Sequence, residues 1–252
     1  MKKRILLTGA TGFVGRQIFA ALCKADVELR LVVRVGSESS LPQIDAAEIV
    51  RTDDIFEESV EWWAVTCQGV DIVIHAAWYA EPAVYMQSPK NLDCLAGTLQ
   101  LAAACVRAGV QRFVGIGSCS EYDMSCGYLS IDTPLRPSTL YAAAKAAAFL
   151  FLSMLLPQQG VSFAWARPFY LYGEGEDDRR LVPYLRARLS AGEPAELSSG
   201  TQIRDYLDAG DVRKAAEMLG RVHTSVGIIE HGLKIGRSIG FPTANMTREC
   251  EG

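Results

Sequence analysis

Three regularly spaced glycines near the N-terminus restrict the fold of this chain more than any other feature. Gly9, Gly12 and Gly15 follow the apolar run 4–8 and open the helical stretch 13–23. A helix that starts in this way leaves its first backbone N–H groups unpaired. These groups, together with the positive end of the helix dipole, favour the binding of a pyrophosphate. The placement predicts the first βαβ unit of a dinucleotide-binding sheet. A glycine turn selected only for its backbone angles is the alternative.

The rest of the chain continues the alternation of strands and helices. The predicted strands are rich in Val and Ile and apolar throughout, as a parallel sheet covered on both faces requires. We therefore expect an α/β fold with a doubly wound, Rossmann-like parallel sheet. Strands are expected at 4–8, 28–33, 48–50, 70–75, 112–116 and 161–166, and helices at 13–23, 57–67, 91–108 and 140–156. After about residue 170 the pattern loosens, and a ligand-binding loop is expected at 172–178.

Composition limits the class of protein. With 252 residues, 49% of them hydrophobic, the chain has room for one large domain and a small appendage, which we place at 1–210 and 211–252. A net charge of −4 argues against a nucleic-acid partner, because phosphate binding needs a surplus of Lys and Arg. The apolar segment 140–156 is short for a membrane span and contains Lys145, so we expect a buried helix and no membrane association.

The cysteines and histidines of the chain favour a cytoplasmic location and argue against a metal site. The seven cysteines form no CxxC pair, which favours free thiols in a reducing cytoplasm over a zinc site or a disulfide framework. The three histidines are too few for a histidine-based metal site. His75 ends a predicted strand and is interpreted as a residue that positions the backbone. Cys119 has no histidine near it in sequence, so we interpret it as a small packing residue instead of a nucleophile.

The end of the second predicted strand bears on the choice of dinucleotide. An acidic residue there holds the ribose 2′-hydroxyl of NAD, whereas an arginine accommodates the 2′-phosphate of NADP. Arg34 stands at this place, which favours NADP over NAD, although an arginine at a strand end is also common as solvated surface. After the third strand, Asp53 or Asp54 can accept a hydrogen bond from the adenine amino group or cap the next helix, which is expected near Glu57.

Tyr141 and Lys145 suggest acid–base chemistry. They lie four residues apart on a predicted helix, so their side chains share one face. A neighbouring ammonium stabilises a phenolate and is expected to lower the pKa of Tyr141. The Tyr-x-x-x-Lys spacing alone is a weak signal. Together with the glycine motif, and with Ser118 at the end of the fifth predicted strand, it becomes strong.

These motifs together resemble the extended short-chain dehydrogenase/reductases, in particular the NAD-dependent epimerase/dehydratase family that acts on nucleotide sugars. The resemblance runs from residue 3 to residue 211. It rests on TGATGFVG at 8–15, IHAA at 74–77, GS at 117–118, YAAAK at 141–145, RPF at 167–169, YG at 172–173 and RDY at 204–206.

The resemblance implies a role for each matched residue. Tyr141 would exchange a proton with the substrate oxygen, Lys145 would hold the nicotinamide ribose, and Ser118 would hydrogen-bond the reacting oxygen. The implied cofactor contacts are Gly9, Thr11, Gly12, Phe13, Val14, Gly15, Arg34, Asp54, Ile55, Ala76, Ala77, Tyr141, Lys145 and Pro168. The implied substrate contacts are Ser118, Ser120, Tyr170, Arg179 and Arg204, with solvated surface as the alternative for the arginines.

One departure from the family pattern bears on the reaction. The sugar 4,6-dehydratases of this family follow the active-site hydroxyl with Asp-Glu, whereas Cys119 and Ser120 follow Ser118 here and Glu121 comes one position too late. The resemblance therefore favours reduction of a 4-keto-6-deoxy sugar or 4-epimerisation over elimination of water. A non-catalytic dinucleotide-binding protein with a truncated substrate domain is the alternative function.

The C-terminal segment does not follow the family pattern. Residues 203–247, with GFPTAN at 240–245, resemble the start of a riboflavin kinase domain. Few residues follow this string, so we expect an incomplete barrel without kinase activity. By resemblance, the helices 91–108 and 140–156 pair with their symmetry mates, which predicts a homodimer.

Overall fold

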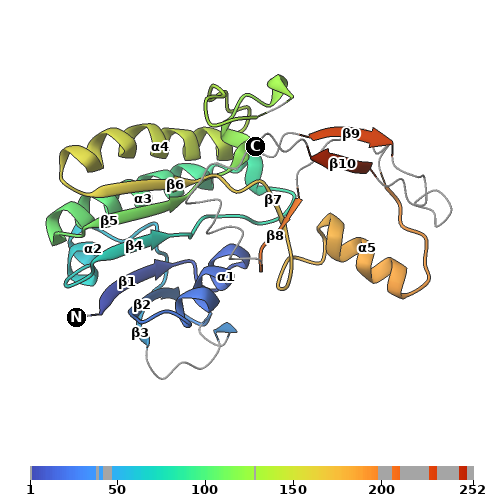
Figure 1. Ribbon diagram of the computed structural model, residues 1–252. Coiled ribbons are helices and arrows are strands. Elements are labelled where there is room, and N and C mark those ends of the chain that lie inside the picture. Colours follow the sequence, from blue (N-terminus) through green and yellow to red (C-terminus); the bar gives the residue numbers. More distant parts are fainter. Residues whose placement is uncertain are drawn as a thin grey trace.

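The central feature of the structure, a computed structural model, is one sheet of six parallel strands (Figure 1). The structure describes residues 2–37, 40–41, 47–127, 129–197 and 206–210, and the backbone of two further strands. The six strands are β1 (Lys3–Thr8), β2 (Val27–Arg34), β3 (Ala47–Thr52), β4 (Ile72–His75), β5 (Arg112–Ile116) and β6 (Ser162–Ala166). Their order is β3-β2-β1-β4-β5-β6. This order confirms the doubly wound parallel sheet.

Helices cover both faces of the sheet. Leu6 of β1 and Phe113 of β5 pack with Trp63, Leu101 and Leu152 in one fully buried cluster. The helices that supply these side chains are α2 (Val60–Thr66), α3 (Lys90–Ala108) and α4 (Leu140–Gln158). On the opposite face, α1 (Phe13–Leu22) contributes the buried Phe19 to a second cluster, with strand residues such as Leu7 and Leu31.

Helix boundaries follow local capping. The Ser59 side chain accepts a hydrogen bond from Trp62 N at 3.1 Å, so α2 begins at Val60 and not near Glu57 as the sequence predicted. Asp54 instead closes a turn, because its Oδ1 accepts from Phe56 N at 2.9 Å. The alternative in which Asp53 or Asp54 caps this helix is therefore wrong, and the contact with adenine stays a prediction.

Several short elements beyond the main sheet were not predicted. The expected loop at 172–178 is preceded by β7 (Tyr170–Tyr172) and followed by α5 (Leu181–Ser190). Strand β7 pairs in parallel with β8 (Tyr206–Asp208). Among the described residues, the short 3₁₀ helices η2 (Tyr85–Gln87), η3 (Cys119–Glu121) and η4 (Met124–Cys126) lie in the loops. The backbones of β9 (Gly227–His231) and β10 (Ala244–Arg248) form an antiparallel pair. The proposed domain boundary near residue 210 stays a prediction.

Helix α4 is long and apolar enough to cross a membrane, with a mean hydropathy of 1.6. In the structure it packs on α3 and β6, and its alanines Ala142, Ala144, Ala146 and Ala148 are buried. Lys145 is also buried, and its Nζ donates to the carbonyl of Ile116 at the end of β5. One face of α4 is therefore buried, as the sequence predicted, although only 39% of its apolar window is buried in all.

The glycine motif brings β1, α1 and β4 into close contact. Gly9 has φ +75°, and a Cβ there would lie 2.6 Å from Ala77 N. A Cβ on Gly15 would lie 1.9 Å from the Gly9 carbonyl oxygen. The motif therefore lets α1 begin directly against the end of β1, beside the β1/β4 boundary where the strand order reverses.

The spacing of these atoms makes Gly15→Ala a test of the packing. We expect it to lower the free energy of unfolding by roughly 1–3 kcal/mol, because the new methyl group forces the turn apart. Gly12→Ala is the matched control, since Gly12 has φ −82° and its Cβ would lie 3.4 Å from the Gly9 oxygen. Urea unfolding measures both variants. Equal stability of the two would contradict this account of the turn.

Candidate active site

The three residues predicted to be catalytic meet at the carboxyl edge of the sheet. Ser118 follows β5, whereas Tyr141 and Lys145 lie one turn apart on α4. Thr139 begins that helix by accepting a hydrogen bond from Ala142 N at 3.1 Å. Lys145 Nζ lies 2.5 Å from the Ile116 oxygen. The Ser118 side chain is close enough to Tyr141 to act on the pKa of its phenol, which it lowers. The structure therefore assembles the predicted cluster.

Lys145 is buried in a partly aromatic setting. Its Nζ lies 3.9 Å from the centroid of the Trp78 ring, a cation–π contact. Burial lowers the pKa of Lys145 to about 7, while Glu121 and Cys94 act in the opposite direction. Near neutral pH this amine is therefore poised between its charged and neutral forms.

Tyr141 stands between two other aromatic rings. Its ring meets that of Tyr85 edge-on at 4.9 Å and that of Trp78 at 6.3 Å. Burial raises the pKa of Tyr141, Tyr85 adds to the rise, and the hydrogen bond from Ser118 opposes it. The prediction that the pKa of Tyr141 is lowered is wrong for this structure, since Lys145 faces Trp78 and the Ile116 carbonyl. The phenol is protonated at neutral pH, which suits a proton donor.

Glu121, which was not predicted as a site residue, holds the loop that carries Ser118. Ser118 caps η3 in a reciprocal capping box, in which Glu121 accepts from Ser118 N at 2.7 Å. The Ser118 and Ser120 hydroxyls lie 2.8 Å apart. The Ser-x-x-Glu spacing was the signal that could have revealed this role of Glu121. Trp78 and Tyr85 carried no comparable signal, because their contacts are made across the fold.

The residues around the glycine motif fit a dinucleotide. Gly12 has no side chain to cap α1, so the first N–H groups of the helix, from Phe13 onward, are free of an N-cap contact. The close approach of Gly9 and Ala77 leaves no room there for a Cβ. Small residues, free backbone donors and a helix N-terminus together match the needs of a pyrophosphate. The predicted contacts Thr11, Val14, Gly15 and Ala76 belong to the same turn, helix start and strand end.

His75 connects β1, β4 and α3 through hydroxyl groups. Thr98 Oγ1 donates to the Cys94 carbonyl at 2.7 Å, which leaves its lone pair to accept from His75 Nε2 at 3.0 Å. His75 Nδ1 then accepts from Thr8 Oγ1 at 2.9 Å, and Thr8 Oγ1 accepts from Ala77 N at 3.3 Å. Burial and Lys145 lower the pKa of His75 to about 3. The imidazole is neutral at physiological pH, which agrees with a positioning role.

The other predicted cofactor contacts lie at strand ends near this edge. Arg34 ends β2 and is exposed. Asp54 is half-buried, with one oxygen used in the turn to Phe56. Ile55 packs against the core cluster below α2 and α3. Pro168 lies beside the Ser118 loop, because its carbonyl accepts from Cys119 N at 3.1 Å. Their contacts with a cofactor stay predictions.

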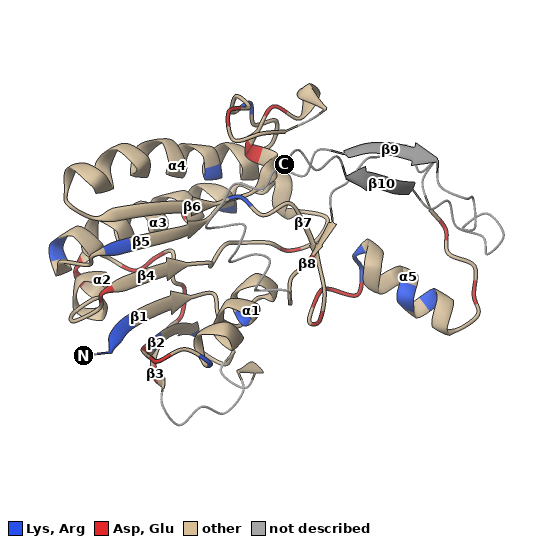
Figure 2. Cartoon of the chain, viewed as in Figure 1, with Lys and Arg blue, Asp and Glu red and all other residues tan. Residues whose placement is uncertain are grey.

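The residues predicted to bind the substrate do not form one cluster with Ser118, Tyr141 and Lys145 in the described contacts. The Tyr170 ring lies 5.7 Å from that of Tyr206. Arg179 is exposed and pairs with Asp177 at 2.8 Å and with Glu81 at 3.1 Å, so it links the loop after β7 to the loop after β4. Acidic residues colour the segment between β7 and α5 (Figure 2). Arg204 lies outside the described residues.

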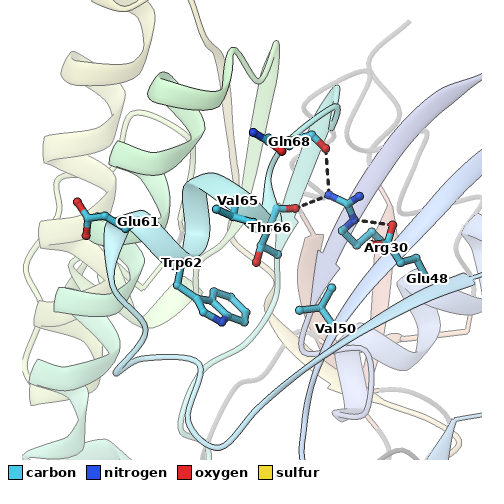
Figure 3. A pocket seen from close by; sticks show the side chains of 8 residues that line it. All are labelled: Arg30, Glu48, Val50, Glu61, Trp62, Val65, Thr66 and Gln68. Carbon is cyan, nitrogen blue, oxygen red and sulfur yellow. Dashed lines mark hydrogen bonds and ion pairs between the residues drawn. The ribbon is translucent and has the colours of Figure 1, made fainter.

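A hollow of about 690 Å³ lies away from this cluster, between α2 and strands β2 and β3 (Figure 3). Arg30 spans it, donating to Glu48 at 2.8 Å and to the carbonyls of Thr66 and Gln68 at 2.5 and 3.0 Å. The residues predicted for the active site do not line it. Among the described residues, three or more His, Cys, Asp or Glu side chains do not gather as metal ligands would.

The sheet order, the glycine turn and the Ser-Tyr-Lys cluster define a dinucleotide-binding enzyme fold of the short-chain dehydrogenase/reductase type. The chain belongs to the NAD dependent epimerase/dehydratase family, which matches residues 5–227. A second family, Riboflavin kinase, matches residues 219–251. This agrees with the resemblance seen in the C-terminal sequence.

Relatives of known activity are nucleotide-sugar enzymes. The chain is 25% identical to a dTDP-6-deoxy-L-talose 4-dehydrogenase (NAD(+)) from Aggregatibacter actinomycetemcomitans, over 82% of this chain and 76% of the relative. It is also 25% identical to a dTDP-glucose 4,6-dehydratase from Actinoplanes sp., over 82% and 69%. The solved structure of MoeE5 in complex with UDP-glucuronic acid and NAD is 30% identical, with a TM-score of 0.70 over 87% of this chain and 73% of that one.

Proposed function

We propose that this protein is an NAD(P)-dependent oxidoreductase of a nucleotide-linked sugar, which reduces a 4-keto-6-deoxy sugar or epimerises a sugar at C4. The observation that carries the proposal is the meeting of Ser118, Tyr141 and Lys145 beside the glycine turn. A bound nicotinamide cofactor would supply or accept the hydride at the sugar carbon. A relative that is a dTDP-6-deoxy-L-talose 4-dehydrogenase and a similar structure solved in complex with UDP-glucuronic acid support the substrate class.

The chain's own residues would handle the proton. In reduction, Tyr141 gives its phenolic proton to the carbonyl oxygen as the carbon receives hydride, and its raised pKa keeps that proton in place beforehand. The Ser118 hydroxyl donates a hydrogen bond to the same oxygen. Lys145 holds the ribose hydroxyls, and its pKa near 7 lets it return a proton toward Tyr141.

The loop after β5 favours reduction or epimerisation over elimination of water. Elimination needs an acid and a base placed at the sugar, but Cys119 and Ser120 occupy the two positions after Ser118. Glu121 does not replace them, because its side chain is fully buried and ion-paired with Arg167 at 2.7 Å.

The described cysteines are free thiols, which supports the predicted cytoplasmic location.

A panel of nucleotide-linked ketosugars with NADH or NADPH tests the function through the absorbance of the reduced cofactor. Oxidation of the cofactor with a 4-keto-6-deoxy sugar is the expected result. A separate assay of UDP-linked and dTDP-linked hexoses tests epimerisation. Tight cofactor binding without turnover in either assay would overturn the proposal and favour the non-catalytic dinucleotide-binding protein.

Tyr141→Phe tests the proton donor. We expect kcat to fall by about 10²–10⁴-fold, because the variant keeps the ring but has no proton to give. Cofactor affinity, measured by fluorescence titration, should stay near that of the wild type. Tyr184→Phe serves as the matched control, since it removes a hydroxyl from α5 outside the cluster. A Tyr141→Phe enzyme with normal kcat would show that another group supplies the proton.

Arg34→Asp tests the proposed preference for NADP. The substitution replaces a cation at the end of β2 with an anion that repels a 2′-phosphate, so the ratio of NADPH to NADH affinity should fall by about tenfold or more. Arg107→Asp makes the same charge change at an exposed site on α3. If both variants leave the affinity ratio unchanged, Arg34 does not select the cofactor.

We also propose a homodimer formed through α3 and α4. Leu150, Phe151 and Met154 on α4 are 55%, 55% and 68% exposed, a patch of large apolar side chains that a second copy would cover. Leu150→Glu should convert the dimer to a monomer in sedimentation velocity, whereas Val65→Glu on α2 should not. A wild-type protein that sediments as a monomer at micromolar concentration would contradict the proposal.

A further inference from the structure

Glu121 lies at the centre of a buried polar network behind the catalytic loop. Its side chain is 0% exposed. Oε1 accepts from Ser118 N at 2.7 Å, and Oε2 accepts from Arg167 Nε at 2.7 Å. Trp165 Nε1 reaches both oxygens, at 3.1 and 3.2 Å. One carboxylate therefore joins η3, β6 and the segment that follows β6.

The strand next to this network leaves space for it. A Cβ on Gly117 would lie 2.2 Å from Trp165 Nε1 and 2.4 Å from Glu121 Oε1. A Cβ on Gly115 would lie 2.2 Å from the Trp165 ring. Two glycines of the β5 segment thus make room for the indole and the carboxylate, so the network is packed into the interior.

The network acts on Ser118 through the backbone. With its N–H held by Glu121, Ser118 places its Oγ 2.8 Å from the Ser120 hydroxyl, and its side chain acts to lower the pKa of Tyr141. Cys119 N is bonded to the Pro168 carbonyl at the same time. The hydroxyl proposed to contact the substrate is therefore positioned through its backbone by a buried carboxylate.

Trp165 connects the same carboxylate with the surroundings of Lys145, because its Nε1 donates to both Glu121 oxygens and its ring lies 6.0 Å from Lys145 Nζ. Several groups surround the ammonium: the Trp78 and Trp165 rings, Tyr141 on its own helix, Cys94 of α3, His75 of β4 and the Ile116 carbonyl of β5. Burial lowers the pKa of Lys145, and the negative charge of Glu121 is the main influence that raises it. Glu121 therefore helps to keep the amine protonated.

We propose that Glu121 is a positioning residue of the active site, which holds the Ser118 backbone in place and provides buried negative charge for the catalytic cluster. It acts through Ser118 and Lys145 and does not itself exchange protons with the sugar. Of the two measurements that test this inference, only the enzyme kinetics rest on the proposed function. The electrostatic readout needs no substrate.

Glu121→Gln tests the inference, because the amide oxygen can still accept from Ser118 N while the charge is lost. The titration of Lys145 is followed by NMR of protein labelled with [ε-¹³C]lysine, and Lys145→Met assigns the signal. We expect the midpoint to fall below the wild-type value by roughly half a pH unit or more. Asp132→Asn, which removes an exposed carboxylate from the loop between η4 and α4, should leave the midpoint unchanged.

Kinetics provide the second readout. In Glu121→Gln the alkaline limb of the kcat profile should move to lower pH with the NMR midpoint, while KM for the cofactor stays within about twofold. An unshifted Lys145 midpoint would overturn the inference, even if kcat falls. If the wild type turns over no sugar nucleotide, the proposed function fails while the NMR result still decides the role of Glu121.

A second variant covers the case in which Glu121→Gln does not fold, since that change leaves Arg167 buried without its partner. The double substitution Glu121→Gln with Arg167→Gln removes both charges and lets one amide donate to the other. The Lys145 midpoint should again lie below the wild-type value. A wild-type midpoint in this protein would equally overturn the inference.

Discussion

The buried ammonium of Lys145 is the constraint on which the active-site region depends. Removing a charge from water is costly unless other groups compensate it. Here the Ile116 carbonyl, the face of Trp78 and the charge of Glu121 compensate it together. Each comes from a different part of the fold, so satisfying this one group aligns α4 with β5, η3 and the loop after β4. The position of Tyr141, one turn earlier on α4, follows from that alignment.

Sequence reasoning was most successful where short-range physics decides the outcome. The strand at 112–116 and the start of α4 at Leu140 were predicted as the structure has them, because an apolar run and the Thr139 cap define them locally. The glycine turn was also placed correctly, since its spacing leaves few conformations for a strand that turns into a helix. The family match agrees with the motifs that carried the resemblance.

The same reasoning failed where distant residues decide the outcome. Helix α5 has weak apolar periodicity and its strand neighbour β7 pairs with a segment more than thirty residues away, so neither was expected. The Tyr141 pKa was predicted to fall because Lys145 is its neighbour on the helix. In the folded protein burial decides the pKa instead, and Tyr85 adds to the rise. Contacts of this kind are properties of the assembled site and have no local pattern.

The glycine turn separates two properties that are often linked in binding sites. Its fit to a pyrophosphate comes from backbone groups and from the absence of side chains at Gly9 and Gly15. Arg34, by contrast, is an exposed side chain at the end of β2 that the core does not require. Under the proposed function, anchoring of the dinucleotide is thus tied to folding, whereas the proposed discrimination between dinucleotides by Arg34 is not. Cofactor preference in such a protein can drift or be redesigned by surface substitutions, at little cost to the scaffold that carries the chemistry.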